Sequence, residues 1–254
     1  MNNALLYLGG LVILALSALF AVPYFVDWNS YRGVFEDEAS RMLGRDVRVG
    51  GSVNLHFLPS PYVRLEKVRI ADTAGALQEP FFRTDAVTIR LSVAPFLRGQ
   101  IEAHEMELRR PVLRLAIASD DTWNWQSFAA SWANAAYLPT NVVLSSVTIK
   151  DGVVALHGAD GQERAVYEGI AAELSSPALE GPYRVRATYG KAGAERDLRL
   201  ATAKPEADGS VRVKATLRAA DTATSYALDA KVSDLTRKIR IEGELSAKLP
   251  FAGL

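Results

Sequence analysis

Apolar and polar residues alternate along most of the chain after residue 45. The clearest runs cover residues 53–57, 87–93, 113–117, 183–189, 211–217, 226–232 and 239–245. A period of two is typical of a strand with one buried face and one wet face. Roughly a dozen such runs, separated by short turn signals, predict a mainly β protein. We expect a long curved antiparallel sheet that is either groove-like or folded as a sandwich.

The apolar phase changes inside two of these runs. One change falls at Glu66-Lys67, and the other falls between Ala103 and Met106. A β-bulge inserts one residue into a strand and so shifts which face the following side chains occupy. We therefore expect a bulge at each of these two positions.

Turn signals and one alanine-rich segment divide the β runs. Asp151-Gly152 and Asp208-Gly209 are typical of tight hairpin turns. Residues 127–138 are rich in alanine and end before Pro139. We interpret that segment as a short helix or connector and place a boundary there. The expected division is 1–26, 27–138 and 139–254.

The first 26 residues predict a membrane segment. Residues 4–26 carry no charge, with Tyr7 near one end and Trp28 just past the other. A helix of about 23 residues is roughly 34 Å long, enough to span a bilayer. A cleaved signal peptide is the alternative, with small residues at Ala15 and Ser17. The apolar run continues past them and no basic stretch precedes it, so we favour an uncleaved anchor.

An amphipathic helix is expected directly after the anchor. Asp27 is suited to cap it, and Gly44 is suited to end it. One apolar stripe recurs at helical spacing: Trp28, Tyr31, Val34, Phe35, Ala39, Met42 and Leu43. The stripe could cover the edge of a core or lie on the membrane surface. Acidic residues at 36–38 disfavour an anionic surface, so we favour the core.

Composition removes several classes of function. The 254 residues include 29 Lys and Arg, 29 Asp and Glu, three His and no Cys. A net charge of zero argues against nucleic-acid binding, which needs a basic field. The lack of cysteine excludes disulfides, thiolate metal sites and a cysteine nucleophile.

Candidate chemistry is sparse. The sequence contains no phosphate-binding glycine loop, no G-x-S-x-G elbow and no H-E-x-x-H motif. His56, His104 and His157 are widely separated, and surface histidines are the simpler interpretation. We therefore expect no catalytic, cofactor-binding or metal-binding residues and no enzyme activity.

Acidic pairs and one aromatic motif remain. Glu105 with Glu107 and Glu242 with Glu244 should each share one strand face, and Asp120-Asp121 are adjacent. We interpret them as solvated charges rather than catalytic pairs, which need environments that separate their pKa values. Trp123-Asn124-Trp125 would place both indoles on one face of a strand. Packing explains this motif more simply than a ligand contact does.

An ordered set of short motifs resembles the N-terminal region of AsmA-like proteins of Gram-negative bacteria. The motifs run from the apolar N-terminus to about residue 128: Asp27-Trp28-Asn29-Ser30-Tyr31, Gly44-Arg45, Val49-Gly50-Gly51-Ser52-Val53, Val68-Arg69-Ile70-Ala71-Asp72, Ala94-Pro95-Phe96-Leu97-Arg98-Gly99 and Asn124-Trp125. Phe96 stands where the family favours leucine, and Asp121-Thr122 stands where it favours glycine.

The resemblance implies a location and a ligand class. It implies an inner-membrane anchor at residues 4–26, with the bulk of the chain in the periplasm. Long relatives are bridge-like lipid carriers, so phospholipid acyl chains become the expected partner. The expected role is to shield or pass phospholipid in outer-membrane biogenesis. The alternative is a scaffold that modulates outer-membrane protein assembly through protein contacts or self-association.

The apolar pattern agrees with that implication. One amphipathic helix is too small to cover the apolar face of about a dozen strands. The sheet must therefore fold onto itself, pair with another chain or bury lipid. Burying an acyl chain is favourable by about 0.8 kcal/mol per CH₂ group.

Overall fold

The computed structural model places most of the region after the N-terminal apolar run. It describes residues 7, 9–11, 13–14, 26–56, 60–72, 79–92, 103–120, 122–126, 144–178, 181–191, 193–219, 224–234 and 239–249. Most of the expected anchor at 4–26 lies outside the described residues, as do the 94–99 motif and the 127–138 connector. Within the described part of the chain, no helix has the length and apolar character needed to cross a membrane.

A short helical unit begins the ordered region. A 3₁₀ turn, η1 (Trp28–Tyr31), runs into α2 (Arg32–Leu43). Asp27 accepts a hydrogen bond from the backbone N–H of Asn29 at 3.0 Å, which satisfies one of the free donors at the helix start. Gly44 ends α2 with a φ of 66°, in the left-handed region. Both expected helix ends are confirmed.

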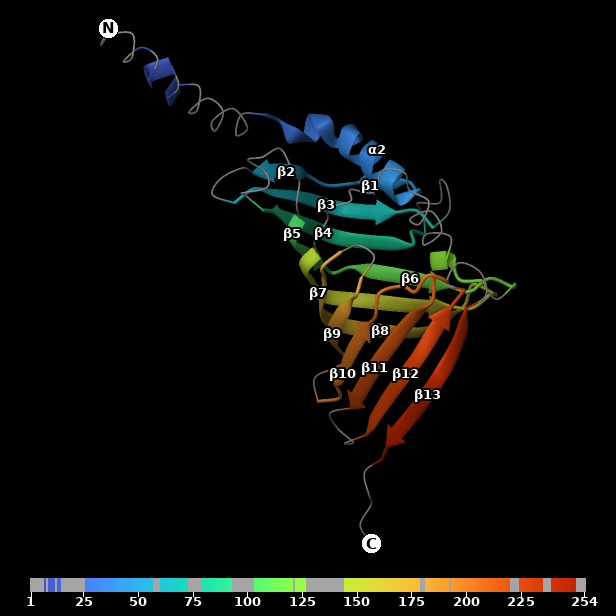
Figure 1. Cartoon of the computed structure of the whole chain (residues 1–254). Coiled ribbons are helices and arrows are strands. Elements are labelled where there is room, and N and C mark those ends of the chain that lie inside the picture. The colour runs from blue at the N-terminus through green and yellow to red at the C-terminus, as the bar shows by residue number, and fades with distance from the viewer. Residues whose placement is uncertain are drawn as a thin grey trace.

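The described strands form one thirteen-stranded sheet. They are β1 (Val47–Val49), β2 (Val53–His56), β3 (Tyr62–Ile70), β4 (Phe82–Leu91), β5 (Ala103–Arg109), β6 (Val112–Ala116), β7 (Leu144–His157), β8 (Glu163–Ser176), β9 (Arg184–Tyr189), β10 (Arg196–Thr202), β11 (Val211–Ala219), β12 (Ser225–Ser233) and β13 (Arg240–Lys248). Figure 1 shows the strand direction turning steeply between β8 and β13, so the sheet is strongly twisted.

The sheet is antiparallel except at one place among the described strands. The spatial order is β1-β3-β4-β5-β7-β8-β9-β10-β11-β12-β13, with β2 beside β3 and β6 between β4 and β7. β5 and β6 both pair with β7 in parallel. The expected antiparallel sheet is therefore a mixed one. Parallel neighbours cannot be joined by a tight hairpin, which explains the long connection at residues 117–143.

The buried core lies at the N-terminal end of the sheet. Its centre is a cluster of valines from β1 to β4: Val47, Val49, Val53, Val68 and Val87. Trp28, Phe35, Ala39 and Leu43 pack against this cluster from η1 and α2. The expectation that the helical stripe covers the edge of a core is confirmed for these residues.

Three positions of the expected stripe, Tyr31, Val34 and Met42, are not among the residues that pack against this cluster. Tyr31 is 50% exposed and Val34 is 65% exposed. Tyr31 is the last residue of η1, whose 3₁₀ geometry rotates side chains by 120° per residue rather than 100°. The change of helix type at this junction shifts the stripe, which periodicity at 3.6 residues does not anticipate.

A crease crosses the sheet from β3 to β8. We define it by residues with positive φ on these strands: Lys67 (53°), Arg110 (47°), Asp151 (54°) and Gly169 (65°). Pairing keeps the same offset on both sides, because Arg109 is opposite Lys150 and Val112 is opposite Val153. β5, β6 and β7 therefore bend together without a change of register, whereas the β7–β8 register shifts on either side of Gly152.

The crease explains one confirmed phase change and one wrong prediction. The expected bulge at Glu66-Lys67 is a bend with Lys67 in the left-handed region. Asp151-Gly152 was expected to be a hairpin turn, but β7 continues on both sides of it as one strand. The positive φ of Asp151 bends the strand instead of reversing it, because neighbours on both sides hold it in the ladder.

Of the two expected bulges, the one at Glu66-Lys67 is replaced by a bend with no shift in the β3–β4 register, whereas the one between Ala103 and Met106 is present. Arg90 is opposite Glu105 whereas Leu91 is opposite Ala103, so one backbone position of β5 between them has no partner in β4. This extra residue shifts the apolar phase of β5.

Candidate functional site

One face of the sheet is apolar from β3 to β13, and we call it the apolar face. Residues directly opposite each other on neighbouring strands point to the same side. Each of these strands contributes two apolar residues in register: Val63 and Leu65, Val87 and Ile89, Met106 and Leu108, Val147 and Ile149, Ala172 and Leu174, Val185 and Ala187, Leu198 and Leu200, Ala215 and Leu217, Tyr226 and Leu228, and Leu245 and Ala247.

The apolar face is covered at one end only, as far as the described residues show. There η1 and α2 pack on β1 to β4. From β9 onward the described strands contact their ladder neighbours and no second layer. Most apolar side chains there are half-buried, and at the last strand Ile241 is 62% and Leu245 is 73% exposed.

The opposite face, which we call the polar face, carries ion pairs between neighbouring strands. Arg90 on β4 contacts Glu105 on β5 at 2.7 Å. Glu107 accepts from Lys150 on β7 at 2.9 Å. The two faces therefore differ in chemistry along the whole length of the sheet, and the apolar one is the candidate for binding apolar ligands.

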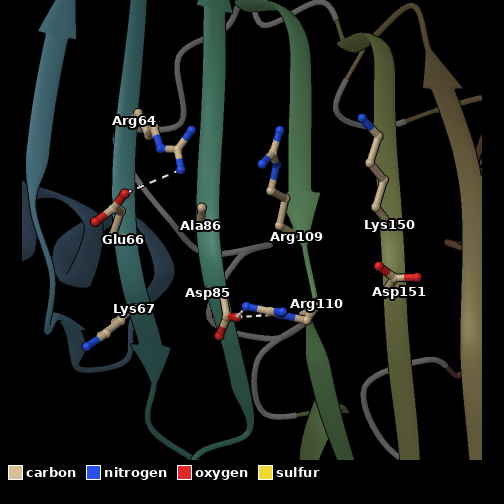
Figure 2. A pocket seen from close by; sticks show the side chains of 9 residues that line it. All are labelled: Arg64, Glu66, Lys67, Asp85, Ala86, Arg109, Arg110, Lys150 and Asp151. Atoms are coloured by element: carbon tan, nitrogen blue, oxygen red, sulfur yellow. Dashed lines mark hydrogen bonds and ion pairs between the residues drawn. The ribbon is translucent and has the colours of Figure 1, made fainter.

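A hollow lies on the polar face, at the crease. It has a volume of about 500 Å³. Nine residues line it and are drawn as sticks in Figure 2: Arg64, Glu66 and Lys67 on β3, Asp85 and Ala86 on β4, Arg109 and Arg110 at the end of β5, and Lys150 and Asp151 on β7. Positive φ at Lys67, Arg110 and Asp151 places this hollow on the crease.

Charges in this hollow largely compensate each other. Arg64 contacts Glu66 at 3.3 Å, and Arg110 forms an ion pair with Asp85. Figure 2 shows both pairs as dashed lines. A hollow of paired charges gives no favourable burial to an acyl chain. We attribute it to the bending of the sheet rather than to a ligand.

A buried polar network joins three of the sequence motifs. The guanidinium of Arg45 donates to the backbone oxygens of Ala71 (3.2 Å) and Asn124 (2.6 Å) and lies 3.4 Å from the Asp72 carboxylate. The Asn124 side chain donates to Asp72 at 3.0 Å. Burial lowers the pKa of Arg45, and Asp72 opposes that shift. These motif residues hold the end of α2, the end of β3 and the 122–126 segment together.

Helix side chains also satisfy backbone groups at the sheet edge. Glu36 accepts from the backbone N–H of Val49 at 2.7 Å, and Asn29 accepts from that of Val53 at 3.0 Å. Free N–H groups on an edge strand are sites of unwanted pairing. The Asn29 of the helix-opening motif therefore has a structural role.

The histidines do not form a site in the described part of the chain. His56 stacks on Tyr62 with ring centroids 4.6 Å apart. His157 ends β7, on another part of the sheet, and the side chain of His104 lies outside the described residues. No group of His, Asp and Glu side chains suited to a metal occurs among the described residues.

Of the acidic pairs, Glu105 and Glu107 lie on the polar face as ion-pair partners. Glu105 and Glu107 face the same side, as expected. Hydrogen bonds from Arg109 and Lys150 lower the pKa of Glu107, so it stays ionised at neutral pH and is unsuited to act as an acid. Glu242 and Glu244 are exposed on β13. A hydrogen bond from Thr122 lowers the pKa of Asp120, and Asp121 lies outside the described residues.

The tryptophan motif is not a strand, which corrects the sequence interpretation. Trp123 forms an isolated bridge with Ile117, and residues 124–126 start a helical turn. The turn is stabilised because Gln126 accepts from the backbone N–H of Trp123 at 2.7 Å. The two indoles therefore do not share a strand face. Asn124 between them carries the structural role instead.

Sequence reasoning missed the apolar residues of β8. Ala165 and Tyr167 keep one phase, and Ile170, Ala172 and Leu174 keep the other. The phase changes at Gly169, where β8 meets the crease. The sequence signal that could have revealed these residues is a change in the phase of the apolar alternation, like the one at Glu66-Lys67.

These features define a class of protein: a long, single-layered β-sheet with one apolar face and one charged face, closed at its N-terminal end by an amphipathic helix. The chain belongs to the AsmA family, whose model matches residues 2–248. This is a cell-envelope family implicated in outer-membrane biogenesis and lipid transport, and it is not an enzyme family. No curated protein and no solved structure matches the chain significantly.

Proposed function

We propose that this chain shields or passes phospholipid acyl chains along its apolar face, as an inner-membrane-anchored periplasmic protein of outer-membrane biogenesis. Residues 4–26 would be the single-pass anchor. Residues 27–138 would close one end of the apolar face, and residues 139–254 would extend it. Family membership supports the envelope role, and the remaining details are part of the proposal.

The observation that carries this proposal is the continuous apolar face. It holds two apolar residues on each ladder strand from β3 to β13, and no described layer covers it from β9 onward. An uncovered apolar surface of this extent calls for an occupant. An acyl chain fits because each buried CH₂ group contributes about 0.8 kcal/mol and needs no polar partner.

Site-specific photo-crosslinking in living cells tests the proposal. Benzoylphenylalanine replaces Leu200 on the apolar face in one version of the full chain and Arg199 on the polar face in the matched control. Both residues lie side by side on β10, so expression and location should match. Mass spectrometry then identifies the crosslinked species.

The outcomes are distinct. We expect a phospholipid adduct at position 200 and none at position 199. Equal adducts at both positions would show that the probe reports bulk membrane. No lipid adduct at position 200, in a chain that is correctly located, would contradict the proposal.

A second candidate function is a scaffold that acts through protein contacts, and β13 favours it. Among the described strands β13 pairs with β12 alone, and Ile241 and Leu245 are both largely exposed. An edge strand with apolar side chains can pair with a strand of another chain. Benzoylphenylalanine at Leu245 would then give a protein adduct, whereas the lipid function predicts a phospholipid adduct there as well.

A further inference from the structure

The polar face of β9, β10 and β11 carries an array of cations around a short side chain. Pairing aligns Arg184, Ala201 and Lys214 in one row across the three strands. The next row consists of Arg186, Arg199 and Thr216. Because Ala201 is small, its neighbours surround a hollow of about 280 Å³, which we call the Ala201 hollow. Four cations line it, and none of the residues lining it is acidic.

Carboxylates compensate part of this array, and Glu173 on β8 is directly opposite Arg186. Arg199 contacts Asp197 at 3.1 Å and Lys214 contacts Asp229 at 3.2 Å. Arg184 and Arg186 form no ion pair with the described residues. The hollow at the crease differs, because Arg64, Arg109, Arg110 and Lys150 each contact a carboxylate there.

The alignment of Arg186 with Arg199 places two like charges opposite each other, with Glu173 beyond Arg186 and Thr216 beyond Arg199 in the same row. The two are directly opposite on adjacent strands, and like charges in that position repel. An anion between them would replace this repulsion with attraction. A guanidinium matches a phosphate group well, since it can donate two parallel hydrogen bonds to it. The Thr216 hydroxyl in the same row supplies a further donor.

We propose that the Ala201 hollow binds a phosphate group, carried either by a soluble molecule or by a lipid headgroup. The site lies on the face opposite the apolar one, so it does not rest on the proposed acyl-chain function. Its cations come from three adjacent strands held in one register, which fixes their spacing without help from a loop.

Isothermal titration of the full chain in uncharged maltoside micelles tests this proposal. One arm adds inorganic phosphate at constant ionic strength, balanced with chloride. The other arm adds short-chain phosphatidylglycerol to the micelles. The test variant is Arg186→Gln with Arg199→Gln. It should lose phosphate affinity by roughly tenfold or more, as expected when charge-assisted hydrogen bonds are removed.

A matched control uses another opposed arginine pair. Arg69 and Arg83 are also directly opposite on neighbouring strands and exposed, but they line none of the described hollows. Arg69→Gln with Arg83→Gln removes the same charge, so its affinity for phosphate should stay within about twofold of the parent. The fold of both double variants is checked by their melting temperatures, which should stay close to that of the parent because all four arginines are exposed.

Each outcome of the titrations either supports or overturns the proposed phosphate site. Saturable binding of inorganic phosphate that only the Arg186/Arg199 variant loses supports a site open to soluble phosphate. Binding of phosphatidylglycerol alone, lost in the same variant, supports a headgroup site. An equal loss of phosphate affinity in both double variants would mean that binding depends only on overall charge, and this would overturn the proposal. So would the absence of binding in both arms.

Discussion

The N-terminal region (residues 27–126) and the C-terminal region (144–249) obtain their order in different ways. The first has two layers, with η1 and α2 packed on a cluster of buried valines. In the second, the buried apolar residues are Val147 and three alanines, at 155, 187 and 230, as far as the structure describes it. Alanine buries little area, so this region gains little from a dry core.

This difference assigns stability mainly to the N-terminal region and a ligand-accessible apolar surface to the C-terminal region. Backbone pairing and cross-strand contacts hold the C-terminal region, while its apolar side chains stay half-buried. The N-terminal region can dispense with an occupant because its own helix covers the sheet. The C-terminal region keeps the surface that an occupant would use, at the cost of intrinsic stability.

An aspartate introduced at an apolar position should lower stability far more in the N-terminal region than in the C-terminal region. Val53 is 1% exposed in the N-terminal core. Val53→Asp should destabilise that region by several kcal/mol, because a carboxylate there has no partner. Leu200→Asp on the half-buried apolar face should cost about 1 kcal/mol or less. Thermal unfolding is followed by far-ultraviolet circular dichroism, to which strands of both regions contribute, and by tryptophan fluorescence, which reports the N-terminal part because all four tryptophans lie between residues 28 and 132. Equal losses of melting temperature would contradict the two-region picture.

The motif network should give the next largest effect. Arg45→Ala leaves Asp72 without its buried partner and should cost about 3–5 kcal/mol. The matched control is Arg41→Ala on α2, whose 2.8 Å pair with Glu38 is exposed and is worth under about 1 kcal/mol. Urea unfolding of the two variants compares them directly. A small effect at Arg45 would show that the network orders the motifs without stabilising them.

The crease allows a substitution that stabilises. Lys67 has a φ of 53°, which costs a non-glycine residue about 1–2 kcal/mol. Lys67→Gly removes that strain but adds about 0.5–1 kcal/mol of backbone entropy cost, so a net gain of about 0.5–1 kcal/mol remains. Lys214→Gly, in a regular strand, should instead lose about 0.5–1 kcal/mol. Chemical unfolding of both variants should give opposite signs. Loss of stability at both would show that the Lys67 side chain matters more than its φ.

Local signals in the sequence predicted much of the fold. Asp27 and Gly44 marked the helix ends, and strict alternation located β4, β9, β11 and β12. These signals depend on residues close in the chain. The parallel pairing of β5 and β6 with β7 could not be predicted, because a long connection leaves the partner of a strand open.

The crease was only partly predictable for a related reason. A one-residue phase shift is visible at Glu66-Lys67, yet the same kind of bend at Asp151-Gly152 looks like a hairpin turn in the sequence. Local sequence cannot tell a bend from a reversal, since both use positive φ. The neighbouring strands decide between them. Likewise, alternation indicated an apolar face, but only the register shows that it is continuous across strands.

Acid should act on the C-terminal region through Asp229. Hydrogen bonds from Arg212 and Lys214 lower the pKa of Asp229 from 3.8 to about 2. A lowered pKa in the folded state means that the carboxylate stabilises the fold above about pH 4, and that this contribution is lost as the pH falls toward 2. Asp229→Asn removes the dependence, so its far-ultraviolet circular dichroism should change less than that of the parent between pH 4 and 2. The site is exposed, so the effect is small. Tryptophan fluorescence, which reports the other region, should be the same for both. A parallel shift of fluorescence would mean that the two regions unfold as one unit.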